Sequence, residues 1–312
     1  MVKNTLNKGL RKKRKLNRVT AYDVIVMALV VLITVIIAYP LWFVIVASVS
    51  PADDVASGKT LLWFSKFTLD AYKNVFQEER IWIGYRNTIF YTVVGTLYNL
   101  ALTLPAAYAM TKKQIPFHGL ISWFFFLTMF ISGGLIPSFL LRKELNLYNT
   151  PWVMIITMGV SCYNLIICRQ YFSNNIPGEL RDAAYMDGCG DIKTFLKIYI
   201  PLSKPIIAVL ALYCAVGKWN DYMSGVIYLQ NQDYYTLQQM IQIVTQQGVN
   251  VEQLFEDPSL DAESISAIMD RYYLARTMKY AIVFVGCAPL LIAYPFVQKY
   301  FVKGVMIGSV KG

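Results

Sequence analysis

Histidine is nearly absent from this sequence, because His118 is the only one among 312 residues. One histidine cannot supply a metal site that needs several histidine ligands. A Ser-His-Asp triad would have to be built on His118 itself. Charge is scarce as well, since Asp, Glu, Lys and Arg together make up 15% of the residues. That fraction is too small to cover the surface of a soluble domain. The composition argues against a soluble enzyme.

Paired cysteines are also missing. The five cysteines are scattered, and no C-x-x-C pair occurs, so neither a disulfide framework nor a zinc site is indicated. The segment "ASGKT" (56–60) resembles the end of a phosphate-binding loop, but Asp53 stands where that motif requires glycine. We therefore expect no metal, cofactor or nucleotide site in this chain. If ATP and Mg²⁺ are used, a partner subunit binds them.

Long apolar runs are what the sequence does contain. Hydrophobic residues make up 56% of the chain, and a bilayer crossing needs about 20 consecutive apolar residues. The sequence predicts an all-α, polytopic membrane protein. The six predicted spans are 21–49, 86–111, 118–141, 150–170, 204–228 and 277–300.

Basic residues indicate the orientation of these spans. Most of the 29 Lys and Arg residues fall on the side of the N-terminus, which predicts that both termini are cytoplasmic. The basic segment 1–20 could serve as a nucleic-acid arm. Because a span follows it directly, we interpret it instead as a topology anchor that meets anionic lipids. We expect no nucleic-acid partner, and we assign 21–312 to one transmembrane domain.

A charged insert at 177–204 interrupts the apolar runs on the cytoplasmic side. Pro177 suits the first turn of a helix, and Gly188 or Gly190 can take a left-handed turn that ends it. Asp191 then suits the N-cap of a second helix, which Pro201 would stop. The residues alone predict two short helices at an angle. They leave open whether this loop covers the end of the bundle or docks a partner.

The stretch "PGELRDAAYMDGCGDIKTFLKIYIPLSKP" (177–205) resembles the EAA loop of ABC-importer permeases. In that family the loop forms a coupling helix that sits in a groove of the ATPase subunit. The resemblance implies coupling roles for six residues, with aspartate at position 182 where the family usually has glutamate. These are Asp182, Ala183, Ala184, Asp187, Gly188 and Pro201.

Four further stretches are similar to carbohydrate-importer permeases of the MalG type, and most of all to their LplC-like branch. They are "GGLIPSFLL", "LNLYNTPWVMII", "AVGKWNDYMSGVIYL" and the tail "QKYFVKGVMIGSVKG". The resemblance implies the type I importer permease fold in a bacterial cytoplasmic membrane. It also implies a heterodimer with a second permease, two ATP-binding-cassette subunits, an extracellular solute-binding protein and a carbohydrate substrate.

Polar residues inside predicted spans are candidates for the substrate path, because a bilayer penalises them unless they face a cavity or a partner. In the fifth span, Lys218 and Asp221 can pair on one helical face, while aromatic rings nearby suit stacking on sugars. Packing against the partner permease is the alternative for the aromatic residues. The predicted path residues are Trp219, Asn220, Tyr222, Tyr163 and Asn164, of which the last two also fit interhelical contacts.

Two other hypotheses remain. The chain could be an importer permease for a non-sugar solute, or an intramembrane enzyme such as a lipid-linked glycosyl transferase. The enzyme hypothesis lacks clustered acids or histidines in the spans. The acidic segment 230–276 is too long for an idle connector. We expect it to be external, either as a plain lid or as a contact for the binding protein.

Overall fold

The computed structural model describes residues 21–157, 159–254, 272, 278–295 and 298. Every regular element in these residues is helical, which confirms the predicted all-α class. The basic segment 1–20 and most of the tail "QKYFVKGVMIGSVKG" (298–312) lie outside the described residues, and so does the stretch 261–269, for which the sequence also allows a helix. In chain order the elements are α1 (Ala21–Ser48), α2 (Ala52–Ala56), α3 (Asp70–Gln77), α4 (Glu79–Ala109), α5 (His118–Leu127), α6 (Leu135–Glu144), α7 (Trp152–Ile156), α8 (Cys162–Asn175), α9 (Gly178–Met186), α10 (Asp191–Thr194), η1 (Phe195–Tyr199), α11 (Ile200–Leu202), α12 (Lys204–Trp219), α13 (Tyr222–Tyr228), η2 (Gln232–Tyr234) and α14 (Leu237–Leu254), followed by the helix Met278–Pro295.

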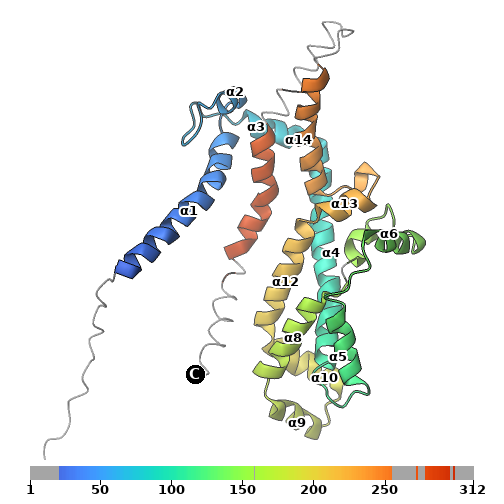
Figure 1. Ribbon diagram of the computed structural model, residues 1–312. Coiled ribbons are helices and arrows are strands. Elements are labelled where there is room, and N and C mark those ends of the chain that lie inside the picture. Colours follow the sequence, from blue (N-terminus) through green and yellow to red (C-terminus); the bar gives the residue numbers. More distant parts are fainter. Residues whose placement is uncertain (1–20, 158, 255–271, 273–277, 296–297, 299–312) are drawn as a thin grey trace, which may run out of the picture.

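Helix α4 is the axis of the bundle, and α7, α8, α12 and α14 all pack against it (Figure 1). Its buried face is rich in small and polar residues. Such residues let neighbouring helix backbones approach closely. Inside a membrane this close packing matters, because burying apolar side chains away from lipid contributes little free energy. The short α3 lies at the end where α4 begins, whereas α9 and α10 lie at the end where it terminates (Figure 1).

Three of the described helices are long and apolar enough to cross a membrane. They are α1, α4 and Met278–Pro295; a fourth candidate arises if the segment Asp191–Leu202 and α12, which meet at an angle of 82°, are counted as one broken span. Most of α1 is exposed, and it becomes buried only at Val46–Ser48. An apolar helix with such a free surface has to meet lipid or another protein.

Three predicted spans are broken in the structure, which corrects the sequence analysis. The run 118–141 divides into α5 and α6 at Gly134, whose φ of 83° favours glycine. The run 150–170 divides into α7 and α8, and the hydroxyl of Ser161 caps α8. The run 204–228 divides after Trp219, where a new cap starts α13. Mean hydropathy stays high through these runs, but local features such as Gly134 and the side-chain caps at Ser161 and Asp221 start a new helix within each.

Helix α6 folds back against α13 through aromatic side chains. The rings of Phe139 and Tyr228 stack with centroids 6.0 Å apart, and the guanidinium of Arg142 lies 4.4 Å from the centre of the Tyr228 ring. The backbone N–H of Asn149 donates to the carbonyl of Tyr228 at 2.9 Å. These contacts fix the course of the chain between α5 and α8.

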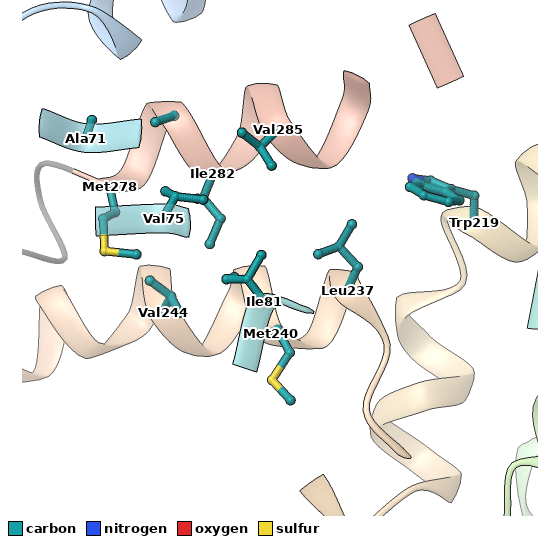
Figure 2. Close-up of a cluster of buried hydrophobic side chains, with 11 residues drawn as sticks. Ala71, Val75, Ile81, Trp219, Leu237, Met240, Val244, Met278, Ile282 and Val285 are labelled. Atoms are coloured by element: carbon teal, nitrogen blue, oxygen red, sulfur yellow. The ribbon is translucent and has the colours of Figure 1, made fainter. Parts of the chain in front are cut away.

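A hydrophobic core joins α3, α4, α12, α14 and the helix Met278–Pro295 (Figure 2). Helix α14 includes most of the sequence stretch 236–248, for which the apolar spacing predicts a helix. Its core residues Leu237 and Met240 are almost fully buried. The start of the acidic segment 230–276 is therefore part of the bundle.

Candidate functional site: the 177–204 loop and the polar centre of the bundle

The 177–204 loop begins with α9, whose last helical residue is Met186 and which is followed by a left-handed turn at Gly188. Gly188 has a φ of 72°. Its N–H donates to the carbonyl of Tyr185 at 3.0 Å, and the N–H of Cys189 donates to that of Ala184 at 2.8 Å. This pair of bonds is a Schellman motif, which satisfies carbonyls at a helix end and requires a residue that tolerates positive φ. Of the two glycines considered in the sequence, Gly188 makes the turn.

The second half of the loop differs from the prediction in two respects. Gly190, not Asp191, is the N-cap of α10, and Asp191 is its first helical residue. Pro201 lies inside helical structure and does not end it; the break comes at Ser203, before α12. Pro201, the second residue of α11, is preceded by the π-helical η1, which ends at Tyr199. This wider turn accommodates a residue that has no N–H to donate and a ring that crowds the preceding turn.

The loop presents charged residues to the outside of this chain. Asp182, Ala183 and Asp187 are exposed, and Met186 is 88% exposed, whereas Ala184 is buried. On α9, Ala184 therefore packs inward while Ala183 faces out. An exposed Met beside an exposed acid gives this end of α9 a mixed surface.

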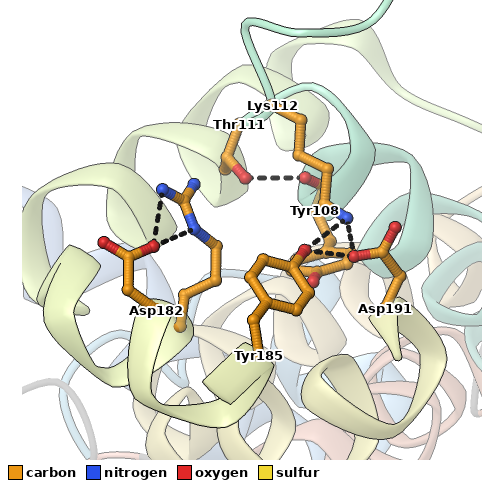
Figure 3. A network of polar contacts seen from close by, with 7 residues as sticks. Tyr108, Thr111, Lys112, Asp182, Tyr185 and Asp191 are labelled. Carbon is orange, nitrogen blue, oxygen red and sulfur yellow. Dashed lines mark hydrogen bonds and ion pairs between the residues drawn. The ribbon is translucent and has the colours of Figure 1, made fainter. Parts of the chain in front are cut away.

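Lys112 connects the two halves of the loop to the end of α4 (Figure 3). Its ammonium forms an ion pair with Asp191 and donates a hydrogen bond to the hydroxyl of Tyr185 at 3.2 Å. The Tyr185 hydroxyl in turn donates to Asp191. The side chain of Lys112 is only 13% exposed, and its nitrogen lies 4.8 Å from the centre of the Tyr108 ring. The only sign of Lys112 in the sequence is that two adjacent lysines follow a predicted span.

These contacts define the charge state of the loop. Hydrogen bonds from Lys112 and Tyr185 lower the pKa of the Asp191 carboxyl, so it is ionised at neutral pH. A cavity of about 340 Å³ opens beside them. It is lined by Thr111, Lys112, Lys113, Gln114, Arg181, Asp182 and Tyr185.

Lys218 is buried in the polar centre of the bundle. Its nitrogen donates to the carbonyls of Met154 at 2.8 Å and Ile155 at 3.3 Å. Gly95 makes room for it, since a Cβ there would lie 2.3 Å from the Lys218 Cε. The predicted pair with Asp221 does not form within 4.0 Å, because α12 ends at Trp219 and the Asp221 carboxylate caps α13 by accepting from the Ser224 N–H at 3.0 Å. A cation at the last carbonyls of α7 also suits the helix dipole.

The five predicted path residues occupy different environments. Trp219 is 5% exposed, lies in the core of Figure 2, and donates its indole N–H to the Gly286 carbonyl at 3.1 Å. Its ring is therefore not available as a stacking surface, and intrachain packing replaces the predicted role. Asn220 is exposed at the end of α12, and Tyr222, in the first turn of α13, is partly buried.

Tyr163 and Asn164 also differ from each other in exposure. Tyr163 is 57% exposed, whereas Asn164 is buried. The Asn164 amide donates to the sulfur of Cys214 at 3.5 Å, and the Cys214 thiol donates to Asn99 at 3.0 Å. Asn164 thereby links α8, α12 and α4. Its contacts are those of a residue that joins helices, which was the alternative to a place in the substrate path. Of the five predicted path residues, Asn220, Tyr222 and Tyr163 have side chains that are at least partly exposed.

Within the described residues no group of three or more His, Cys, Asp or Glu side chains could hold a metal ion. Helices of membrane-crossing length, a buried polar centre and an exposed helical loop at one end place the chain among integral membrane proteins.

The chain belongs to the family described as binding-protein-dependent transport system inner membrane component, whose model matches residues 81–307. It is a multi-pass membrane permease and not an enzyme. The family implies a binding protein and a separate ATPase as partners.

Two relatives from Bacillus subtilis are similar over most of the chain. One is the polygalacturonan/rhamnogalacturonan transport system permease protein YtcP, which is 34% identical and aligns over 93% of this chain and 98% of its own length. Protein LplC is 35% identical, over 88% of this chain and 89% of its own length. The structure is also similar to one chain in the crystal structure of a bacterial ABC transporter involved in the import of the acidic polysaccharide alginate. The two chains superpose with a TM-score of 0.79 and are 30% identical in sequence, and the match covers 90% of this chain and 96% of the other.

Proposed function

We propose that this chain is one permease subunit of an ATP-driven carbohydrate importer and that its substrate is an oligosaccharide or polysaccharide fragment. The observation that carries the proposal is similarity over nearly the whole chain to a permease named for polygalacturonan and rhamnogalacturonan and to a chain from an alginate importer. Import of a non-sugar solute is the alternative. The family provides no support for the intramembrane enzyme.

The proposed complex contains a second, different permease, two ATP-binding-cassette subunits and an extracellular solute-binding protein. The 177–204 loop docks the ATPase through α9, where Asp182, Ala183 and Asp187 are accessible. Ala184, Gly188 and Pro201 act through the shape of the loop, since Ala184 is buried and Gly188 forms the turn. Exposed charge on a short helix supports docking, because a subunit interface needs accessible groups.

In the proposed topology the chain crosses the membrane six times, with 118–141, 150–170 and 204–228 crossing as broken segments and both termini in the cytoplasm. Broken helices are tolerated at membrane depth where their backbone is buried in protein or lines a cavity. The segment 230–276 is then external. Asn220, Tyr222 and Tyr163 contribute to the path, and neutral hydrogen-bonding groups suit a substrate that must be released.

The test is substrate-stimulated ATP hydrolysis by the complete complex in proteoliposomes. Oligogalacturonides, alginate oligomers and neutral oligosaccharides are compared with an amino acid and a peptide, each added with the binding protein. Stimulation by one carbohydrate class alone is the expected result. Stimulation by the amino acid or peptide, with none by any carbohydrate, would overturn the proposed substrate class.

A further inference from the structure

We infer that Lys112 is a positioning residue that locks the turn between α9 and α10 onto the end of α4. Movement of α9 is thereby passed to the axis of the bundle. The inference rests on the proposed function for its consequence in transport, and on the contacts of Figure 3 for its structural content.

The turn by itself leaves the angle between the two helices weakly defined. Residues 187–190 contain two glycines, and glycine allows more backbone conformations than any other residue. The Schellman bonds end α9 but reach no residue of α10. A contact that touches both helices is needed to fix their relative orientation, and Lys112 supplies one.

Lys112 contacts one residue on each side of the turn. It donates to Tyr185 on α9 and forms an ion pair with Asp191 on α10, and these two residues also bond to each other. Hydrogen bonds between charged groups are stronger than neutral ones. The Lys112 side chain is only 13% exposed, which limits screening by water and salt on its side of the ion pair, whereas the Asp191 side chain is 58% exposed. The three groups form a closed set, so removal of the central cation cuts both helices off from the end of α4 and leaves only the Tyr185–Asp191 hydrogen bond between them.

An aromatic cluster connects the lock to the body of the protein. Lys112 lies over the ring of Tyr108, which packs on Phe195 at 5.2 Å and on Tyr199 at 4.6 Å between ring centroids. Tyr199 in turn packs edge-on against Phe172 of α8 at 5.5 Å. Packed side chains of this kind transmit displacement because close-packed interiors deform little. A push on α9 therefore reaches α4 and α8 together.

The chain offers a matched control in Lys113. This neighbouring lysine has the same charge and lines the same cavity, but it is exposed. In the described structure it makes none of the contacts that Lys112 makes with α9 and α10. Lys112→Met and Lys113→Met each remove one positive charge from the same place, and only the first removes the lock.

The experiment uses the assembled complex and two readouts. Hydrogen exchange at the amides of Gly188 and Cys189 reports on the turn, and binding-protein-stimulated ATP hydrolysis reports on coupling. For Lys112→Met we expect exchange to rise and stimulation to fall by about three- to tenfold, as for the loss of one partly shielded charged contact. Lys113→Met should match the wild type. The exchanged pair, Lys112→Asp with Asp191→Lys, should recover towards wild-type values.

Unchanged exchange and stimulation in Lys112→Met, relative to Lys113→Met, would overturn the inference. Should Lys112→Met not assemble, Tyr185→Phe removes one hydroxyl of the set and keeps the ring. Faster exchange at Gly188 in that variant supports the lock, and wild-type exchange refutes it. Hydrogen exchange needs no substrate, so a wild-type complex that no carbohydrate stimulates would count against the proposed function and not against the lock.

Discussion

The side-chain nitrogen of Lys218 lies 2.8 Å from the carbonyl oxygen of Met154, so a buried cation on α12 closes the end of α7. Helix ends leave carbonyls without partners, and inside a membrane no solvent satisfies them. Lys218 therefore donates hydrogen bonds to the carbonyls at the end of α7, as water does at a protein surface. Gly95 on α4 leaves the space through which its side chain passes.

The first prediction concerns that passage. Gly95→Ala places a methyl group against the Lys218 side chain and should lower the yield and thermal stability of the complex, because a buried side chain has to leave its site. Gly217→Ala is the control, since a Cβ at Gly217 meets nothing within 4 Å in this chain. Detergent-solubilised complexes are compared by thermal unfolding. Equal melting temperatures of Gly95→Ala and Gly217→Ala would contradict a steric clash between a Cβ at position 95 and the Lys218 side chain.

Lys218→Met provides the second prediction. It should impair assembly, because the carbonyls of Met154 and Ile155 lose their donor and each buried unsatisfied group costs about 1–3 kcal/mol. Adding Asp221→Leu should not restore assembly, since Asp221 caps α13 instead of pairing with Lys218. The amount of intact complex on size exclusion measures this. Recovery in the double variant would show that the two charges interact after all.

Trp219 and Asn220 should respond differently to substitution. Trp219→Ala removes a buried ring and is expected to destabilise the protein by about 3–5 kcal/mol. Asn220→Leu changes an exposed residue, so the complex should form normally while uptake of labelled oligosaccharide falls. Normal uptake in Asn220→Leu would remove this residue from the proposed path.

The docking face of α9 gives a further prediction. Asp182 is exposed and contacts only the adjacent Arg181 among the described interactions, at 3.3 Å, so Asp182→Ala should leave thermal stability unchanged. Stimulated ATP hydrolysis should nevertheless fall, because the carboxylate is proposed to meet the ATPase. Asp182→Glu keeps the charge and is expected to retain activity. Stimulation that is normal in Asp182→Ala would refute the docking role.

Topology can be checked by cysteine labelling. Leu62 and Met186 are 67% and 88% exposed, and the proposed orientation puts them on opposite sides of the membrane. In a variant without the five native cysteines, a membrane-impermeant maleimide applied to whole cells should label Leu62→Cys. Met186→Cys should react only after the membrane is opened. Labelling of Met186→Cys in intact cells would reverse the proposed orientation.

The sequence by itself determined the all-helical membrane class, the family and the position of the loop between two apolar runs. These properties follow from local features: the length of apolar runs, the spacing of glycines and the motif at 177–205. The sequence also predicted a left-handed turn at Gly188 or Gly190, because few other residues tolerate that backbone conformation, and the structure places it at Gly188.

Only the tertiary structure decided which polar residues share a site. The interval between Lys218 and Asp221 fits a pair on a continuous helix, but the helix ends between them and a carbonyl distant in sequence receives the lysine. Trp219 turned out to be a core residue because the helix Met278–Pro295 covers it. Lys112 meets Tyr185 and Asp191 only once α4 and the loop are packed. Sequence spacing governs neighbours along one helix, whereas contacts between helices depend on where each helix ends and what it packs against.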